Sequence, residues 1–276
     1  MQLVPGKVAI VTGSGRGIGR ATAELLAQHG ARVVVNDLKE EVAEETASAI
    51  RQKGGEALVV AGSITDPTFP DRLAKTAVDK LGGLDIIVNN AGYTHDGVIH
   101  KMSDEQWAAM LDVHLTGPFR LLRAASLYWR AWAKAEIAAG KQIMRKVINV
   151  SSTSGVAGNA GQVNYAAGKM GIVGVTKTLA REWGRLNVNV NAVAYGFIET
   201  RLTAAKDAAS KAKAEVDGQQ VELGIPEEIR KQAKAMIPLG RAGTPEEAAG
   251  PVLFLASPLA DYVTGTVVLV TGGSYM

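Results

Sequence analysis

The strongest constraint on the fold comes from the first forty residues. Residues 8–11 (VAIV) form a continuous apolar run, and residues 12–19 (TGSGRGIG) follow it as a glycine-rich segment. A helical pattern then ends at His29-Gly30, and a second apolar run, residues 32–37, closes with the acid Asp37. A strand, a glycine-rich turn, a helix and a second strand in this order are what a dinucleotide-binding βαβ unit requires. The segment therefore predicts nucleotide binding.

The glycine-rich segment also predicts which residues hold the nucleotide. Its glycines permit a tight turn and a close approach of the backbone to a phosphate. The N-terminus of the following helix offers free N–H groups to a pyrophosphate. The residues expected to contact the cofactor here are Gly13, Arg16, Gly17, Ile18 and Gly19.

Strand and helix patterns alternate through the rest of the chain. The expected strands cover residues 8–11, 32–37, 57–61, 84–89, 146–151, 188–193 and 266–270. The expected helices cover residues 41–52, 71–81, 104–114, 118–140 and 162–184, with another after Thr244. Ser103 and Thr244 each begin a capping box. This alternation predicts an α/β fold with one parallel, doubly wound sheet covered by helices on both faces. We see no repeat or linker and expect a single domain over residues 1–276.

Composition excludes several classes of function. Hydrophobic residues make up 47% of the chain, charged residues 21%, and the net charge is only +3, so nothing favours a nucleic acid or a membrane surface as partner. The chain has no cysteine, which excludes disulfides and thiolate chemistry, and we expect no metal site. No signal peptide and no apolar span long enough to cross a membrane is visible. We expect a soluble, cytoplasmic protein.

Trp129 and Trp132 lie close to Arg130 and Lys134, a combination that can form a stacking patch for nucleic acid. The alternative is a helix face that is buried against another subunit. We prefer the second interpretation.

Tyr165 and Lys169 are the candidate chemical groups. They are four residues apart, so on a helix their side chains share one face. An ammonium group there would favour the phenolate and lower the pKa of the tyrosine from about 10 toward neutrality. Ser152 precedes Tyr165 in the sequence and could hydrogen-bond the same substrate oxygen. The pair alone also arises by chance on amphipathic helices, so its context decides.

That context resembles the short-chain dehydrogenase/reductase family across nearly the whole chain. The matching blocks are Thr12-Gly13-x-x-x-Gly17-x-Gly19, Asn89-Asn90-Ala91-Gly92, Ser152, Tyr165-x-x-x-Lys169 and Gly196-x-x-x-Thr200. The resemblance implies a single-domain Rossmann fold with a seven-stranded parallel sheet, an NAD(P) cofactor, hydride transfer at a carbinol or carbonyl carbon, and usually a homotetramer. The members most similar in appearance are 3-oxoacyl-ACP reductases and 3-hydroxyacyl-CoA dehydrogenase domains.

The resemblance also implies roles for individual residues. Tyr165 would be the general acid/base, Lys169 would lower its pKa and bind the nicotinamide ribose, and Ser152 would steady the reacting oxygen. The further cofactor contacts it implies are Asp37, Ser63, Ile64, Asn90, Ala91, Gly92, Tyr165, Lys169, Gly196, Ile198 and Thr200.

Three residues depart from the family pattern. His114 replaces the usual Asn that anchors a relay water, and since His can donate and accept hydrogen bonds we keep it as a catalytic candidate. Ser63 replaces an Asp at the adenine edge. Tyr195 replaces a Pro before Gly196, which we expect to relax the turn and add bulk to the pocket.

Two residues favour different cofactors: Asp37 favours NAD, and Arg16 favours NADP. Asp37 can bond both ribose hydroxyls and would repel a 2′-phosphate. Arg16 stands where NADP-using relatives often have an Arg that binds the phosphate, but it can equally face solvent. We predict NAD and leave NADP as the alternative.

The resulting prediction is an oxidoreductase for a secondary alcohol or ketone, with a 3-hydroxyacyl or 3-oxoacyl thioester as the expected substrate class. The alternatives are a dehydrogenase of a sterol, sugar or cyclic alcohol and, in another class, a non-catalytic NAD(P)-sensing regulator. Residues of about 203–235, polar and alanine-rich, follow the sixth expected strand. We expect them to form a mobile helical flap over the substrate, or else a solvated insertion.

Overall fold

A seven-stranded parallel sheet forms the centre of the molecule, with the strand order β3-β2-β1-β4-β5-β6-β9. The computed structural model describes residues 1–205, 213–216, 219–222 and 224–275. The strands of the sheet are β1 (Val8–Val11), β2 (Arg32–Val35), β3 (Glu56–Val59), β4 (Ile86–Asn89), β5 (Arg145–Ser152), β6 (Val188–Tyr195) and β9 (Val267–Val270). The predicted fold class, a single-domain Rossmann fold, is confirmed.

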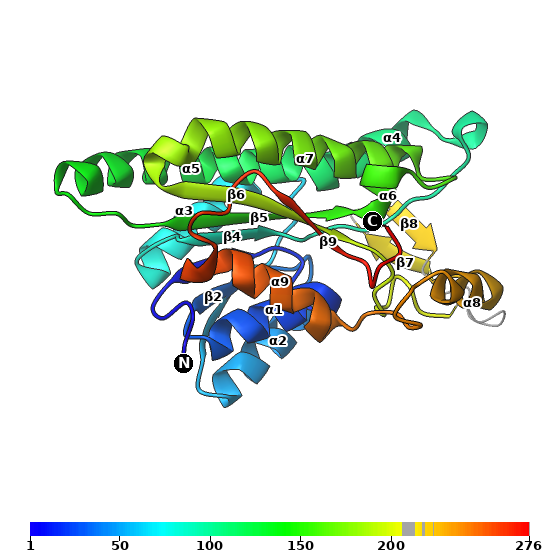
Figure 1. Cartoon of the computed structure of the whole chain (residues 1–276), viewed down its shortest axis with the longest axis horizontal. Coiled ribbons are helices and arrows are strands. Elements are labelled where there is room, and N and C mark those ends of the chain that lie inside the picture. Colours follow the sequence, from blue (N-terminus) through cyan, green and yellow to red (C-terminus); the bar gives the residue numbers. More distant parts are fainter. Residues whose placement is uncertain (206–212, 217–218, 223, 276) are drawn as a thin grey trace.

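Helices cover both faces of this sheet (Figure 1). One layer contains α1 (Gly17–Gln28), α2 (Glu40–Gln52) and α9 (Pro245–Ala256). The other contains α3 (Phe69–Leu81), α4 (Asp104–Leu111), α5 (Gly117–Ala138) and α7 (Val163–Trp183). The short helices are α6 (Thr153–Ala157), α8 (Glu227–Ala235) and the 3₁₀ turns Ile99–Lys101, Gly184–Leu186 and Pro258–Ala260. No helix of the described part of the chain is long and apolar enough to cross a membrane.

Strand β1 is apolar on both sides because each side faces a helix layer. Along β1, Val8 and Ile10 belong to the core beneath α3 and α5, whereas Ala9 and Val11 belong to the core beneath α1 and α9. Successive side chains of a strand point to opposite faces, so a run without polar residues is what a doubly covered sheet needs. Each fully buried Val or Ile contributes about 1.5–3 kcal/mol to this packing.

A π-helical turn, Asp112–Thr116, joins α4 to α5. The capping box predicted at Ser103 opens α4, and the one at Thr244 opens α9. The helical pattern predicted through residue 114 is therefore confirmed, but its last turn widens. The extra residue of a π turn displaces the side chains around it, and such turns are common at functional sites. His114 lies in the middle of this turn.

The segment expected to be a helical flap is only partly helical. Its second half contains α8, but β7 (Lys213–Val216) and β8 (Gln219–Glu222) form an antiparallel pair with Val216 opposite Gln219. The rest of the expected flap, residues 206–212, 217–218 and 223, lies outside the described residues.

The two tryptophans of α5 serve the chain's own core, so the prediction of a face buried against another subunit is wrong for Trp129. Its side chain is 1% exposed and its Nε1 donates a hydrogen bond to Leu84 O at 2.7 Å. Its ring meets Trp183 edge-on at 5.7 Å. Trp132 is partly buried, with the Arg145 guanidinium 5.2 Å from its ring centroid.

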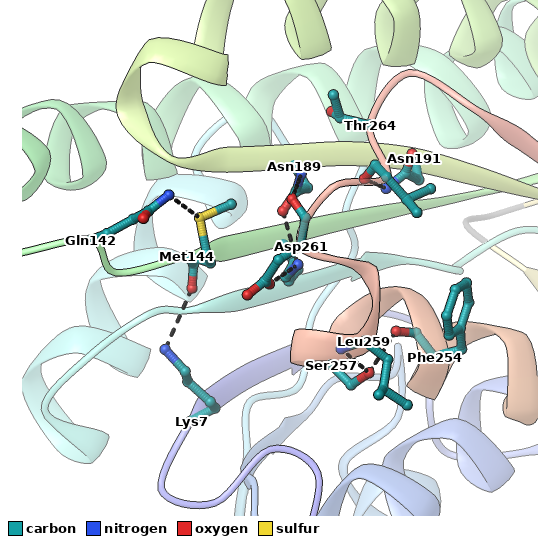
Figure 2. A network of polar contacts seen from close by, with 12 residues as sticks. Lys7, Gln142, Met144, Asn189, Asn191, Phe254, Ser257, Leu259, Asp261 and Thr264 are labelled. Atoms are coloured by element: carbon teal, nitrogen blue, oxygen red, sulfur yellow. Dashed lines mark hydrogen bonds and ion pairs between the residues drawn. The ribbon is translucent and has the colours of Figure 1, made fainter.

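Polar contacts hold the amino-terminal edge of the sheet (Figure 2). Asn189 Nδ2 donates to Asp261 O at 3.1 Å, and Lys7 Nζ donates to Met144 O at 3.4 Å. The buried Lys146 Nζ donates to Asn189 Oδ1 at 2.8 Å and to Asp261 Oδ1 at 2.6 Å. This network joins β5, β6 and the connection to β9 at the edge opposite to the carboxyl ends of the strands.

Candidate functional site

Side-chain hydrogen bonds join the carboxyl ends of β1 and β4, where the strand order reverses. Thr12 Oγ1 accepts hydrogen bonds from the N–H groups of Asn90 and Ala91, each at 3.0 Å. Asn90 Nδ2 donates to Thr12 O at 2.9 Å and to Gly13 O at 3.0 Å. Open α/β sheets bind ligands in the crevice at such a point. The structure thus brings Gly13, Asn90 and Ala91 together, with Thr12 as a clamp that sequence reasoning missed.

The glycine-rich turn leaves the N-terminus of α1 uncapped. Arg16, the N-cap residue, makes no side-chain cap hydrogen bond, and the first turn contains no acid. Gly17 has φ +55°, and the nearest atom to a Cβ built there would be Thr200 Cγ2 at 3.6 Å. Gly19 packs so closely on Gly13 O that a side chain would collide. Helix N–H groups without a side-chain cap, next to a glycine that brings no side chain of its own, suit an anionic pyrophosphate, so this turn fits a dinucleotide.

Asp37 directs its carboxylate back toward the same turn. Its Oδ2 accepts a hydrogen bond from Gly15 N at 3.0 Å, and its Oδ1 accepts one from Leu38 N at 2.9 Å. These bonds fix the carboxylate beside the turn, whereas the neighbouring Arg16 is exposed. The carboxylate of Asp37 therefore has a defined position beside the turn, whereas the guanidinium of Arg16 lies at the surface.

The residues after β3 lie next to Asp37, because Gly62 N donates to Asp37 O at 3.0 Å. Ser63 Oγ accepts from Thr65 N at 3.1 Å and pairs with Thr65 Oγ1 at 2.7 Å, so its hydroxyl is used in its own turn. Ile64 is 4% exposed. Asn36 is another residue that sequence reasoning missed, although a polar side chain at the end of an apolar run was a visible signal. It is buried, and its Nδ2 bonds carbonyls at 3.0 and 3.1 Å, which are those of Val60 and Gly62.

Ser152, Tyr165 and Lys169 meet at the carboxyl end of β5. Ser152 ends this strand, and its Oγ accepts a hydrogen bond from Ser154 N at 3.1 Å, which leaves its hydroxyl proton free to donate. Its side chain hydrogen-bonds that of Tyr165. Lys169 Nζ lies 5.6 Å from the centroid of the Tyr165 ring and donates to Val150 O at 2.7 Å. The three residues predicted as a set are thus brought together.

Burial, rather than the ammonium group, controls the pKa of Tyr165. Burial raises this pKa to about 12; the hydrogen bond with Ser152 lowers it and the Asp96 carboxylate raises it. Burial also lowers the pKa of Lys169 to about 7. The expectation that Lys169 brings the pKa of Tyr165 toward neutrality is therefore wrong for the protein alone. Desolvation penalises the charged form of both groups, so the phenol is protonated at neutral pH.

His114 is neutral and packs beside Tyr165. Its Nε2 lies 2.7 Å from Tyr93 O, and because a carbonyl only accepts, Nε2 carries the proton and Nδ1 is an acceptor. Nδ1 is buried without a partner among the described residues. Burial and then the charge of Lys169 hold the pKa of His114 well below its usual range. The ring meets Tyr165 edge-on at 4.9 Å, and it packs so close to Gly92 that a side chain there would collide.

Tyr195 points into the core rather than into the site. Its side chain is 5% exposed among residues beneath α9, and its hydroxyl donates to Ala248 O at 2.8 Å. Burial raises the pKa of this hydroxyl. The expectation that Tyr195 adds bulk to the pocket is therefore wrong, because the last side chain of β6 faces α9. Its hydroxyl instead ties the strand end to that helix.

The segment after β6 is fixed by local bonds. Gly196 N donates to Val270 O at 3.0 Å, and Ile198, 5% exposed, pairs with Gly243. Thr203 Oγ1 accepts from Thr200 N at 2.9 Å. Thr200 therefore has a defined position opposite the glycine-rich turn. Among the described residues no group of three or more His, Cys, Asp or Glu side chains could hold a metal ion.

A Rossmann crevice that fits a dinucleotide, with a serine, a tyrosine and a lysine at its edge, defines a nucleotide-dependent oxidoreductase. Comparison with known proteins agrees. The model of a family described as enoyl-(acyl carrier protein) reductase matches residues 13–275. The chain belongs to the short-chain dehydrogenase/reductase family, and it is an enzyme that acts on CH–OH or ketone groups.

Several relatives match along their whole length. The 3-oxoacyl-[acyl-carrier-protein] reductase FabG of Vibrio cholerae is 41% identical over 272 residues, 98% of each chain. The 3-oxoacyl-[acyl-carrier-protein] reductase of Synechocystis is 40% identical over 278 residues, 100% of each chain. A crystal structure of a putative short-chain alcohol dehydrogenase from Sinorhizobium meliloti superposes with a TM-score of 0.83 at 31% identity, covering 98% of this chain and 96% of that one.

Proposed function

We propose that the protein interconverts a 3-oxoacyl thioester and the corresponding 3-hydroxyacyl thioester with a nicotinamide cofactor. The observation that carries the reaction is the meeting of Ser152, Tyr165 and Lys169 beside the crevice. The substrate class rests on the relatives named for 3-oxoacyl-[acyl-carrier-protein] reduction, at about 40% identity over the full chain.

In reduction, the carbonyl carbon would accept a hydride, which is the chemistry that a nicotinamide cofactor held by these residues would supply. Tyr165 donates its phenolic proton to the carbonyl oxygen, and Ser152 donates a hydrogen bond to the same oxygen. The raised pKa of Tyr165 keeps that proton on the phenol at neutral pH before the reaction. Once the proton has left, the phenolate is stabilised by the buried Lys169, because charges interact more strongly in a buried site than in water.

His114 would act beside this set as an acceptor. Its Nδ1 is the only ring nitrogen without a proton, because Nε2–H is bonded to Tyr93 O. A buried acceptor next to Tyr165 can hold a water molecule on the route by which the proton of Tyr165 is replaced. This supports keeping His114 as a relay residue in place of the usual Asn.

For the cofactor site we propose Gly13, Arg16, Gly17, Ile18 and Gly19 at the pyrophosphate and Asp37 at the adenosine ribose. Ser63 and Ile64 would flank the adenine, and Asn90, Ala91 and Gly92 would line the crevice. At the nicotinamide end we propose Tyr165, Lys169, Gly196, Ile198 and Thr200. The N-terminus of α1, which has no side-chain cap, and the positive φ of Gly17 support this assignment.

NAD is the proposed cofactor, because the carboxylate of Asp37 is fixed beside the glycine-rich turn, and an acid at the end of the second strand would bond the ribose hydroxyls and repel a 2′-phosphate. We expect kcat/KM to be at least about tenfold higher with NADH than with NADPH. Repulsion of about 1–2 kcal/mol between the Asp37 carboxylate and a 2′-phosphate corresponds to about that factor. Asp37→Ala should reduce the difference. Steady-state kinetics with both cofactors test this, and a tenfold or larger preference of the wild-type protein for NADPH would contradict it.

The reaction itself is tested by following NADH oxidation with a panel of substrates. We expect turnover with a 3-oxoacyl thioester of coenzyme A or acyl carrier protein and a 3-hydroxyacyl product. Cyclic, sterol and sugar ketones serve as comparison substrates. A trans-2-enoyl thioester is also tested, because the matching family is described as enoyl-(acyl carrier protein) reductase. Faster turnover of any of these would overturn the substrate class, and cofactor binding without any turnover would favour the sensing regulator.

A homotetramer is the proposed assembly. Large apolar side chains on the outer faces of α5 and α7 are exposed in the single chain, among them Phe119 at 49%, Leu127 at 70% and Met170 at 50%. Exposed apolar surface of this kind favours burial against another copy, and sedimentation analysis would measure the assembly. The cytoplasmic location stays a prediction.

A further inference from the structure

Asn164, the residue before Tyr165, is fully buried and has every polar atom engaged. It is 0% exposed. Its Nδ2 donates to His95 O at 3.0 Å and to Gln106 O at 3.1 Å, and its Oδ1 accepts from Tyr165 N at 2.8 Å. An Asn side chain offers two donor hydrogens and one carbonyl oxygen. The two donated bonds join α7 to α4 and to the loop after β4, and the accepted bond lies within the first turn of α7.

That loop, residues 93–97 (the 93–97 loop), makes four hydrogen bonds to residues around Tyr165. Three of them are additional to the bond from Asn164. The three bonds are His114 Nε2–H to Tyr93 O at 2.7 Å, Gln162 Nε2 to Asp96 Oδ2 at 3.0 Å and Gly97 N to Gly161 O at 2.8 Å. Asn164 provides the more deeply buried of the two side-chain bonds between the loop and the start of α7, and this bond is partly buried. The bond from Gln162 is exposed.

The first N–H groups of α7 need hydrogen-bond partners from outside the helix ladder. Its N-cap residue, Gln162, provides no side-chain cap, so the first N–H groups of the helix lack capping partners. The Tyr165 N–H is one of these groups, and Asn164 Oδ1 satisfies it. One buried side chain therefore fixes the backbone of Tyr165 and the loop beside it together.

We propose that Asn164 is a positioning residue that sets the place of the Tyr165 phenol relative to Ser152 and the bound substrate. This inference rests on the proposed function, in which Tyr165 transfers the proton. Loss of Asn164 would leave Tyr165 in the chain but let the first turn of α7 and the 93–97 loop move independently. Small misplacements of a reacting group cost up to about a hundredfold in rate.

The test compares Asn164→Ala with Asn189→Ala. Asn189 is also a buried asparagine with hydrogen bonds on both amide atoms, but it lies at the opposite edge of the sheet. We expect both substitutions to lower Tm, and only Asn164→Ala to lower kcat, by about 10- to 100-fold, with the Kd for NADH changed less than about twofold. The pH profile of kcat should also shift, because the surroundings of Tyr165 change.

Asn164→Asp provides a second variant that keeps the bond to Tyr165 N but loses both donated bonds. We expect it to lower kcat as Asn164→Ala does. If kcat and its pH profile stayed unchanged in folded Asn164→Ala, or if Asn189→Ala lost the same turnover at the same loss of Tm, the inference would be overturned. Absence of turnover in the wild-type protein would instead contradict the proposed function, and in that case hydrogen exchange at the Tyr165 amide tests the bond itself. Protection retained in Asn164→Ala would contradict the positioning role.

Discussion

Tyr165→Phe is expected to lower kcat for the 3-oxoacyl thioester by about 10²- to 10⁴-fold, the usual contribution of a positioned general acid. The substitution removes the phenolic proton and the hydrogen bond with Ser152 but leaves the ring in its place beside His114. The Kd for NADH should stay within about threefold, because the loss is confined to the reacting oxygen. Stopped-flow turnover and fluorescence titration with NADH measure the two quantities.

The matched control is Tyr262→Phe, which removes a hydroxyl from a fully exposed tyrosine (104% relative exposure) far along the chain. It should leave both kcat and Kd unchanged. Retention of more than a tenth of the wild-type kcat by Tyr165→Phe would exclude the phenol as the proton donor.

Lys169→Met is expected to abolish most turnover without destabilising the protein at neutral pH. Loss of the cation that stabilises the phenolate should lower kcat by about 10²- to 10³-fold. The same substitution should raise the stability of the fold at neutral pH, because burial lowers the pKa of Lys169 to about 7. The folded protein disfavours the ammonium form, which the unfolded chain keeps up to its ordinary pKa of about 10.4.

The sign of the pH dependence follows from proton binding. Between pH 7 and pH 10 the unfolded state binds more protons at this group than the folded state, so this group makes the stability of the wild-type protein rise with pH in that window. Thermal denaturation should show Lys169→Met more stable than wild type at pH 6–7, with the difference shrinking toward pH 10. A difference independent of pH, or a variant less stable at pH 6 than at pH 10 relative to wild type, would contradict the lowered pKa.

Much of the fold could be predicted because local patterns and tertiary structure agree. The apolar runs at residues 8–11 and 84–89 read as buried strands and form β1 and β4, and the capping boxes at Ser103 and Thr244 open α4 and α9. The proposed catalytic residues Tyr165 and Lys169 could be found for a similar reason, because their spacing on one helix is a local property.

The features that could not be predicted depend on tertiary surroundings. The direction of the pKa shift of Tyr165 depends on how deeply the phenol is buried, which spacing along a helix does not reveal. The proposed role of Asn164 depends on carbonyl groups of His95 and Gln106, which lie 69 and 58 residues away in the chain. The burial of Trp129 in the chain's own core depends on its contacts with Leu84 and Trp183, which form only in the folded protein. The β7–β8 pair was missed because the alanine-rich composition of the segment favoured a helix.

The central claim is that this site transfers a hydride to the ketone carbon of a 3-oxoacyl thioester while Tyr165 supplies the proton. The most direct test incubates the wild-type protein and Tyr165→Phe with NADH that carries deuterium at the transferable position and with a 3-oxoacyl thioester, and identifies the product by mass spectrometry and NMR. We predict a 3-hydroxyacyl thioester with one deuterium at C3 from the wild-type protein and almost none from the variant. Unreacted thioester with the label retained on NADH, or equal product from both proteins, would contradict the claim.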